Sequence, residues 1–255
     1  MSSGEPSIEI VADGDAVGRR GAEIVAETVA ANLEAVLAVP TGSTPLPMFA
    51  ELVSRVKKGG LDLSRVHLFT LDEYVGMPPD RPNSLTGWLT QEFLDPAGID
   101  PARRHLIPAT ADDPMRAAEA YEAELAALGG LDLAVLGLGP NGHVAYNEPG
   151  APVESRTRVV RLTPGSVEQA AGYWPEEDPV PSLAMTMGVA TLLEARQLVL
   201  IVSGEGKAEM LRRTLRDAPG SAVPASWLRL AGNRLRVIAD EAAASRLPDR
   251  VRDIG

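Results

Sequence analysis

The 255-residue sequence contains no cysteine, which excludes disulfide bonds, thiolate metal ligands and cysteine nucleophiles. Histidine is also scarce, and the three histidines, His67, His105 and His143, do not have the spacing of a metal-ligand pair. We therefore expect a protein with no bound metal.

Positive charge and long apolar runs are in short supply as well. The formal net charge of −11 would repel a nucleic-acid backbone or an anionic membrane, so an anionic ligand must be held by a local cluster of donors. No apolar run approaches the length of a membrane span, and the Met-Ser-Ser-Gly-Glu start lacks the basic and apolar regions of a signal peptide. These absences predict a cytoplasmic protein that has neither nucleic acid nor a membrane as a partner.

Apolar segments alternate with helical patterns along the whole chain. Short, continuous apolar runs predict strands, and apolar residues at helical spacing predict the helices between them. The expected strands span residues 8–11, 35–39, 66–70, 133–138, 155–162, 182–187, 198–202 and 235–239, and the clearest helices span 84–93, 114–128, 189–195 and 240–247. This alternation predicts an α/β fold, with one domain over residues 1–255 and an open, mostly parallel sheet covered by helices on both faces. We interpret residues 165–181, which are rich in proline and acidic residues, as a mobile segment or a lid.

The stretch from residue 131 to residue 150 has an apolar run that ends in glycines and is followed by His143 and Glu148. In open α/β sheets, ligands bind at the carboxyl ends of the strands, and glycines there allow a close approach of the backbone. An imidazole beside a carboxylate suits acid–base chemistry near neutral pH. Taken alone, such a pair is more often a structural hydrogen bond than a catalytic pair.

The segment at residues 40–45 follows a second buried strand and precedes a helical pattern. Free amides and the dipole at a helix start favour an anion, so this segment is a candidate phosphate site. Its candidate ligands are Thr41, Gly42, Ser43 and Thr44. An ordinary capped turn explains the same residues, with Ser43 or Thr44 as the N-cap and Pro45 as the first helical residue. The spacing of a Walker loop or a dinucleotide fingerprint is absent.

Charged side chains follow two further strands at the same predicted edge. Asp72 and Glu73 come directly after the strand at 66–70, and Lys207 follows the strand at 198–202. Two acids on a solvated turn would have no function, and a lysine in this position is equally typical of a solvated side chain. A bound anion would, however, offset the unfavourable position of Lys207 at the positive end of a helix dipole.

Three separated motifs now stand in chain order. They are Pro40-Thr-Gly-Ser-Thr-Pro45, Leu71-Asp-Glu-Tyr-Val-Gly76 and Gly139-Pro-Asn-Gly-His-Val-Ala-Tyr-Asn-Glu-Pro149. Together they resemble the motifs of the glucosamine-6-phosphate deaminase/isomerase family, whose fold is shared by 6-phosphogluconolactonases. The resemblance continues through Ser155-Arg-Thr-Arg158, Ala184-Met-Thr-Met-Gly188 and the segment from Ser203 to Lys207, so it covers nearly the whole chain. It implies a modified Rossmann-like fold of the deaminase/isomerase type.

Within this family the sequence resembles the deaminase branch. The lactonase pattern has a serine-containing stretch after the histidine and lacks the Asp-Glu-Tyr-Val-Gly signature. Asp72, Tyr74, Asn147 and Glu148 instead follow the deaminase pattern.

The resemblance implies cofactor-free conversion of a 2-amino-2-deoxy sugar 6-phosphate into a ketose 6-phosphate and ammonia. This activity combines an isomerase with a deaminating hydrolase of amino-sugar metabolism. In it, His143 opens the sugar ring with help from Glu148, and Asp72 carries a proton from C2 to C1. The implied catalytic residues are Asp72, Asn141, His143 and Glu148, and the implied phosphate-binding residues are Thr41, Gly42, Ser43, Thr44 and Lys207.

Two positions depart from the family pattern. Asn141 stands where some members have aspartate; an asparagine can accept a hydrogen bond that fixes the imidazole tautomer, but it cannot stabilise an imidazolium by charge. Gly172 stands where the family usually has an arginine that holds the substrate phosphate. Loss of that charge-assisted contact should weaken phosphate binding about tenfold to a hundredfold, unless a cation such as Arg161 replaces it.

Two other functions stay open at this point. A 6-phosphogluconolactonase-like hydrolase would use His143 to activate water and would leave Asp72 with no proton to remove. A non-catalytic sugar-phosphate sensor is compatible with the altered segment around Gly172. The sequence does not fix the sugar epimer or the oligomeric state, and a homo-oligomer is compatible with it.

Overall fold

The computed structural model of the protein describes residues 4–171 and 179–248. Its main sheet contains β1 (Ser7–Val11), β2 (Val36–Val39), β3 (His67–Thr70), β5 (Arg104–His105), β6 (Leu133–Gly137), β9 (Gln197–Val202) and β10 (Leu235–Asp240). These seven strands lie in the order β1-β10-β9-β6-β2-β3-β5, and every neighbouring pair is parallel. The predicted α/β class with an open, mostly parallel sheet is confirmed.

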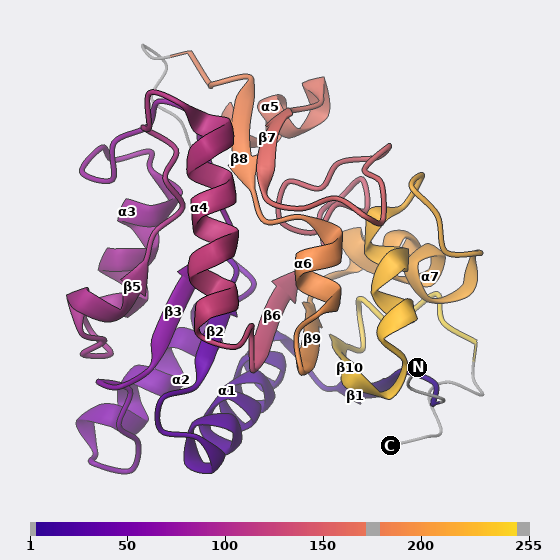
Figure 1. Cartoon of the computed structure of the whole chain (residues 1–255). Helices are drawn as coiled ribbons and strands as arrows, with labels where there is room; N and C mark the ends of the chain where they lie inside the picture. Colours follow the sequence, from indigo (N-terminus) through magenta and orange to yellow (C-terminus); the bar gives the residue numbers. More distant parts are fainter. Residues whose placement is uncertain (1–3, 172–178, 249–255) are drawn as a thin grey trace.

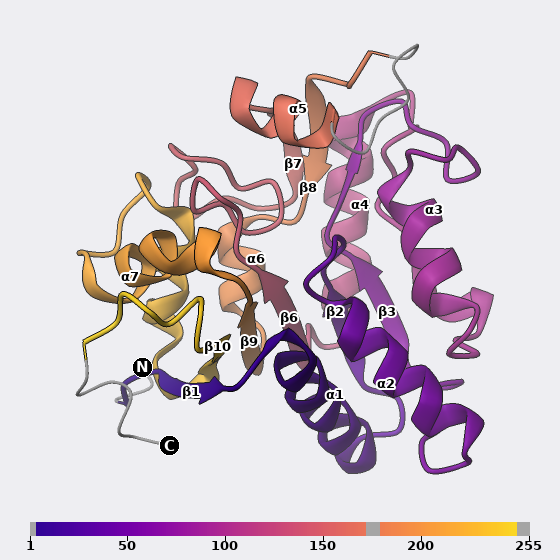
Figure 2. The ribbon, with the colours of Figure 1, turned by 180° about the vertical axis from the view of Figure 1, so that it is seen from behind.

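Helices cover both faces of the main sheet, as the two opposite views in Figure 1 and Figure 2 show. One face carries α1 (Gly14–Ala31), α2 (Leu46–Lys57), α3 (Leu85–Leu89) and the π-helix η1 (Thr90–Leu94). The other carries α4 (Pro114–Ala127), α6 (Val189–Leu193), α7 (Ala208–Arg216) and the 3-10 segment η4 (Pro224–Arg234). Two short 3-10 turns, η2 (Pro101–Arg103) and η3 (Glu205–Lys207), precede β5 and α7. None of the helices in the described ranges is long and apolar enough to cross a membrane.

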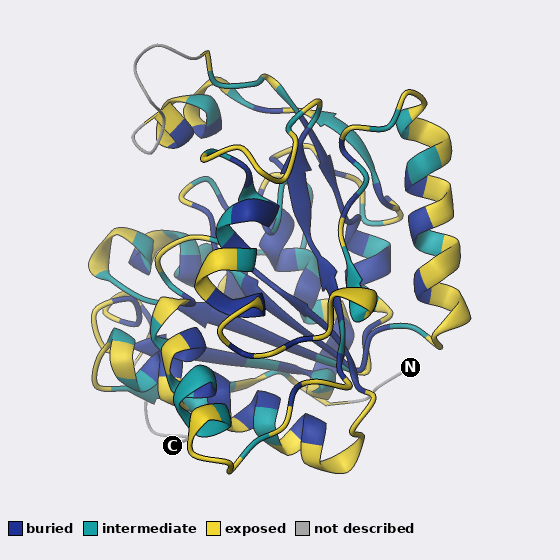
Figure 3. Cartoon of the chain, turned by 90° about the vertical axis from the view of Figure 1, so that its left-hand side faces the viewer, coloured by how far each residue is buried: buried dark blue, intermediate teal, exposed yellow. Residues whose placement is uncertain are grey.

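Alternate residues of each strand pack into two separate cores. In β2, Leu37 and Val39 contact the core under α1 and α2, whereas Val36 and Ala38 belong to the core on the opposite face. This arrangement explains why the strands are continuous apolar runs in the sequence, since both faces of a parallel sheet are buried. Figure 3 shows the result, with central strands that are buried along nearly their whole length and helices that expose their outer sides.

A second, smaller sheet was not predicted. It is antiparallel and consists of β4 (Asp72–Tyr74), β8 (Leu183–Thr186) and β7 (Arg158–Arg161), in that order. The helix α5 (Pro164–Ala171) shares a small apolar cluster with this sheet. The strands expected at 155–162 and 182–187 are present as β7 and β8, but the short charged segment of β4 has no strand pattern, so the pairing of the three into a separate sheet was not expected.

Three predicted elements differ from the structure. The helix expected at 240–247 is a series of turns, because after Ala244 N–H donates to the Asp240 carbonyl the following bonds span only three residues. The expected lid at 165–181 includes α5 at its start, whereas Gly172 and Trp174 lie outside the described residues. Asp72 and Glu73, for which a solvated turn stayed open, are buried and lie in β4 of the second sheet.

Two of the three histidines fasten the edge strand β5. Arg103 lies 2.8 Å from His67 Nε2, His67 Nδ1 lies 2.9 Å from His105 Nε2, and His105 Nδ1 lies 2.7 Å from Glu124. Because an arginine can only donate, His67 Nε2 must accept, so His67 donates from Nδ1 to His105, which in turn donates to Glu124. His67 and His105 therefore have structural hydrogen bonds, and His143 remains for chemistry.

Candidate active site

The strand order of the main sheet reverses between β2 and β6. The chain leaves β2 toward β3 on one side and leaves β6 toward β9 on the other. Such a reversal opens a crevice at the carboxyl ends of the two strands, and ligands of open α/β sheets bind there. The loops that begin at this point are residues 40–45 and 138–150, which are two of the segments singled out in the sequence.

The other two predicted segments flank the same crevice. β9 lies beside β6, so the loop that carries Lys207 starts next to the His143 loop. β3 lies beside β2 and runs through Leu71 into β4, which carries Asp72. The structure thus brings all four segments to one edge of the sheet.

His143 lies on the glycine-rich loop after β6, against the backbone of Gly139. A Cβ atom placed on Gly139 would lie 2.3 Å from His143 Nε2, so only glycine leaves room for the imidazole. Nδ1 of the ring is buried, lies 3.7 Å from Oε2 of Glu148 and makes no hydrogen bond to the part of the chain that the structure describes. That distance is too long for a hydrogen bond, so Glu148 acts on the imidazole mainly through its charge.

Asn141 forms a hydrogen bond with the Glu148 oxygen that lies nearest the imidazole. Its Nδ2 donates to Oε2 of Glu148 at 2.6 Å, and its Oδ1 accepts from the backbone N–H of His143 at 3.1 Å. The expectation that Asn141 fixes the imidazole tautomer by accepting from the ring is therefore wrong for this structure. The asparagine instead fixes the backbone of His143 and the position of the carboxylate.

Glu148 is ionised although it is buried. Burial favours its neutral form, but the neighbouring side chains of His143, Ser166 and Asn141 outweigh burial and hold the pKa of Glu148 at about 2. Thr163 adds donors from its backbone N–H at 3.2 Å and its hydroxyl at 3.3 Å. A fixed negative charge therefore lies beside the imidazole at neutral pH.

Asp72 and Glu73 have different surroundings although they are adjacent. Successive side chains of a strand point to opposite faces. Burial, with a smaller contribution from the Glu73 carboxylate, raises the pKa of Asp72 to about 7. Glu73 is buried on the other side, where it accepts from the Ser84 hydroxyl at 2.6 Å and the Thr86 amide at 2.9 Å at the start of α3. Glu73 is thus a structural acid, and Asp72 is the carboxylate suited to proton transfer near neutral pH.

The loop after β2 is not an ordinary capped turn. The α2 helix starts at Leu46, one residue later than Pro45 as the first helical residue would require, and its N-cap is Pro45, without a side-chain capping bond. Gly42 has φ of +97°, a left-handed conformation that favours glycine. The hydroxyls of Ser43 and Thr44 are consequently not used to cap the helix, which favours the phosphate-site interpretation.

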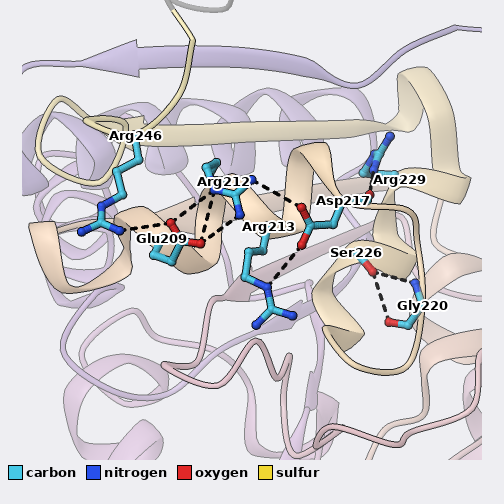
Figure 4. A network of polar contacts seen from close by, with 8 residues as sticks. All are labelled: Glu209, Arg212, Arg213, Asp217, Gly220, Ser226, Arg229 and Arg246. Atoms are coloured by element: carbon cyan, nitrogen blue, oxygen red, sulfur yellow. Dashed lines mark hydrogen bonds and ion pairs between the residues drawn. The ribbon is translucent and has the colours of Figure 1, made fainter.

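Lys207 is half-buried at the start of α7, and burial lowers its pKa. No acid within residues 4–171 and 179–248 forms an ion pair with it, in contrast to Arg212 and Arg213 of the same helix. Figure 4 shows that Arg212 contacts Glu209 and Asp217, that Arg213 contacts Asp217 and that Arg246 contacts Glu209. Lys207 is therefore a half-buried cation with no ion-pair partner among the described residues.

Asp240, at the end of β10, shapes the loop before Lys207. Its carboxylate accepts from the Ser203 hydroxyl at 2.5 Å, from the Gly204 amide at 2.9 Å and from the Ala243 amide at 2.7 Å. Gly204 has φ of +92°, which turns the chain toward η3. A residue far from Lys207 in the sequence thus sets the path of its loop.

Sequence reasoning missed Tyr146, Thr163 and Asp240 as neighbours of the site. Tyr146 lies inside a quoted motif, where a polar aromatic residue between His143 and Glu148 was a usable signal. No signal in the sequence pointed to Thr163 or Asp240, because the contacts of Thr163 depend on the second sheet and those of Asp240 depend on the position of β10. Arg161, the suggested substitute for the missing family arginine, is exposed on the edge strand β7. In the described ranges, no group of three or more histidine, aspartate and glutamate side chains is placed to hold a metal ion.

Comparison with known proteins fits this arrangement. The family model described as glucosamine-6-phosphate isomerases/6-phosphogluconolactonase matches residues 12–237. The chain belongs to this family. Among curated relatives, the glucosamine-6-phosphate deaminase of Rhodopirellula baltica is 42% identical over 95% of this chain and 96% of its own length. The glucosamine-6-phosphate deaminase of Streptomyces avermitilis is also 42% identical, over 94% of this chain and 92% of its own length.

Solved structures agree on the fold of the family. A monomeric glucosamine-6-phosphate deaminase superposes with a TM-score of 0.90 at 33% identity and covers 94% of this chain and 99% of its own. The 6-phosphogluconolactonase of Trypanosoma brucei reaches a TM-score of 0.77 at 24% identity, over 96% of this chain and 100% of its own, and shows a shared fold. Similarity to the deaminases is thus closer in both sequence and structure, and the hydrolase class finds support only among the lactonase relatives.

Proposed function

We propose that this protein is a deaminase that converts glucosamine 6-phosphate, or a close analogue, into fructose 6-phosphate and ammonia. Relatives of this name support the proposal. The observation that carries it is the Asp72 carboxylate, which is buried at the crevice and has a pKa of about 7. A base of this kind suits removal of a proton from carbon. Lactone hydrolysis removes no such proton and would give Asp72 no task.

Ring opening falls to His143 in this proposal. The imidazole moves a proton to the ring oxygen of the sugar and takes up the proton of the C1 hydroxyl, so that the pyranose becomes an open-chain aldehyde. The Glu148 carboxylate, 3.7 Å from Nδ1 of His143, stabilises the positively charged form of the imidazole. Asn141 keeps that carboxylate in place through its 2.6 Å hydrogen bond.

Isomerisation and deamination then follow at Asp72. The carboxylate takes the proton from C2 while the His143 imidazole returns a proton to the C1 oxygen, which gives an enolamine. Asp72 then delivers its proton to C1, which leaves a protonated imine at C2. Water adds to the imine, ammonia departs, and the ketose remains. The protein supplies every proton transfer in this scheme without a cofactor.

The substrate phosphate binds at the crevice at the carboxyl ends of β2 and β6 in the proposed complex, beside the loop that follows β9. Amides and hydroxyls of residues 41–44 surround it at the start of α2, and Lys207 supplies the positive charge. Phosphate would also offset the burial that lowers the pKa of this lysine. A net charge of −11 means that this local site must overcome a repulsive whole-molecule charge.

The test of the reaction is release of ammonia from a panel of amino-sugar phosphates in D₂O. A deaminase of this type gives ammonia and a ketose that carries solvent deuterium at C1. Hydrolysis of 6-phosphogluconolactone without ammonia release would instead make the protein a lactonase. Binding of the sugar phosphates with neither product would make it a sensor.

The phosphate site has its own test, in which Lys207→Ala is compared with Lys58→Ala. Lys58 is an exposed lysine at the end of α2 and controls for the loss of one positive charge. Lys207→Ala should raise KM for the phosphorylated sugar about tenfold or more and leave KM for the unphosphorylated sugar unchanged, because one charge-assisted contact is lost. Gly172→Arg, which restores the family residue, should lower KM for the phosphorylated sugar. Equal effects of the two lysine variants would refute the assignment of Lys207.

A further inference from the structure

Two tyrosine hydroxyls meet beside the proposed reacting groups. Tyr146 donates from its hydroxyl to the hydroxyl of Tyr74 at 2.7 Å, and the two rings are 5.7 Å apart at 47°. Tyr146 comes from the loop of His143, and its ring centre lies 6.0 Å from that of the imidazole. Tyr74 comes from β4, two residues after Asp72. The contact therefore joins the loop of the proposed ring-opening group to the strand of the proposed base.

The backbone around Tyr146 is shaped to make this contact. Ala145 has φ of +47°, a left-handed conformation that non-glycine residues rarely adopt. The flanking residues Val144 and Asn147 form an isolated antiparallel bridge, and the Asn147 side chain donates to the Val144 carbonyl. These contacts hold the turn tightly and direct Tyr146 toward the second sheet.

A second hydrogen bond fastens the same residue to the same sheet. The backbone N–H of Tyr146 donates to the Thr186 hydroxyl at 3.0 Å. Thr186 is the residue paired with Asp72 in the register of β4 and β8. The main chain of Tyr146 thus contacts the strand position opposite the base, and its side chain contacts the same strand as the base.

We propose that Tyr146 is a positioning residue that sets the separation between His143 and Asp72 for the reaction. This inference rests on the proposed deaminase function, in which the two groups act in turn on adjacent carbons of one substrate. A proton transfer requires heavy atoms at hydrogen-bond distance, and small displacements of either group slow it. The tyrosine pair keeps the two groups in register while the sugar changes from ring to open chain.

The electrostatic surroundings keep this contact intact at working pH. Burial raises the pKa of Tyr74 to about 12, with Asp72 and Glu73 adding to the effect, and burial together with Tyr74 and Asp72 raises the pKa of Tyr146 as well. Both phenols therefore stay neutral, and the Tyr146 hydroxyl remains a donor. A phenylalanine at position 146 would fill the same space but could not make the bond.

The experiment compares Tyr146→Phe, Tyr74→Phe and the double variant with Tyr121→Phe. Tyr121 is a matched control, since it is a buried tyrosine whose hydroxyl donates to backbone carbonyls away from the His143 loop. Tyr146→Phe and Tyr74→Phe should each lower kcat about three- to tenfold with KM nearly unchanged, as expected for one lost hydrogen bond. The double variant should be no slower than the slower single variant, because both changes remove one contact. Tyr121→Phe should keep the wild-type kcat.

Failure of this inference is distinguishable from failure of the proposed function. If the wild type releases ammonia and Tyr146→Phe retains its kcat, the positioning role is wrong and the function stands. Independent losses that multiply in the double variant would also overturn it. If the wild type has no deaminase activity, amide hydrogen exchange at residues 143–147 tests the positioning role. Faster exchange in Tyr146→Phe but not in Tyr121→Phe supports a role of the Tyr146–Tyr74 hydrogen bond in holding the His143 loop. Unchanged exchange overturns it.

Discussion

The Asp72 carboxylate determines how the proposed reaction should depend on pH. Its pKa of about 7 means that half of the base is protonated near neutral pH, so activity should fall as the pH drops below 7. Asp72→Asn should bind substrate yet lose C2 proton exchange about 10²–10⁴-fold, because an amide cannot take the proton. Exchange is measured by NMR in D₂O. Wild-type exchange rates in the variant would exclude Asp72 as the base.

Asn141 offers a second prediction for a single residue. Asn141→Asp removes the donor to Oε2 of Glu148 and places a second negative charge beside it, so the pKa of Glu148 should rise above its value of about 2. The carboxyl carbon shift of Glu148, followed by NMR titration, reports this change. Asn32→Asp is the control, since Asn32 donates to Asp132 in the same way but far from Glu148 in the fold. An unchanged Glu148 titration in Asn141→Asp would contradict the role given to the amide.

At this scale the sequence identified residue types better than their contacts. His143, Glu148, Asp72 and Lys207 were all expected at strand ends, and the structure places them there. The hydrogen bond from the Asn141 amide to Glu148 depends on the path of the loop after Gly139. No local sequence pattern specifies that path. Burial raises the pKa of Asp72 at the start of β4, in the second sheet that the sequence did not reveal.

Among the elements, the buried strands, the partly exposed strand at 155–162 and most helices were predictable, whereas the charged strand β4 was not. A continuous apolar run such as Leu198–Val202 predicts a buried parallel strand, and the structure has β9 there. Asp72–Tyr74 forms a strand by pairing with the apolar β8, and no local pattern specifies that pairing. The expected helix at 240–247 is a series of turns, although Asp240 accepts from the Ala243 amide as a helix N-cap does, and nothing in the structure explains its early end.

The loop between β2 and α2 carries a prediction of its own. Gly42→Ala forces a residue with a side chain into a left-handed conformation, at a cost of about 1–2 kcal/mol. An added Cβ would meet no other atom, so this backbone strain is the whole effect, and it should distort the phosphate loop. We expect KM for the phosphorylated substrate to rise. Gly59→Ala is matched to it, with φ of +73° and open space beyond the end of α2. It should cost similar stability without a change in KM, and equal KM values in both variants would argue against a phosphate loop.

For the whole molecule, stability and the proposed activity make opposite demands on Asp72. The pKa is about 7 in the folded state against an ordinary 3.8, so the folded protein binds the extra proton between these values and gains stability as the pH falls. At pH 8 the buried charge costs on the order of 2–4 kcal/mol. Asp72→Asn should therefore unfold at higher urea concentration than the wild type at pH 8, with a difference that shrinks toward pH 4.

His67 contributes with the opposite sign. Burial, followed by the nearby Arg103, lowers its pKa, so the unfolded chain takes up a proton before the folded one does and stability is lost as the pH falls below the ordinary value of 6.5. In Asp72→Asn this loss is no longer offset, and its stability should decline with acidification more steeply than that of the wild type. Parallel urea-denaturation curves for the two proteins from pH 8 to pH 4 would contradict this account.

The reversal of strand order between β2 and β6 also divides the polypeptide into two interleaved halves. The half that ends with α4 contains Asp72 and the phosphate loop, and the half that begins with β6 contains His143, Glu148 and Lys207. β1 of the first half pairs with β10 of the second at the far edge, so the second half is enclosed between strands of the first. A chain cut at the turn of Gly129 and Gly130 would yield two fragments that each lack part of the proposed chemistry. Turnover would then report directly on fragment complementation, because docking of the halves and completion of the catalytic centre are the same event.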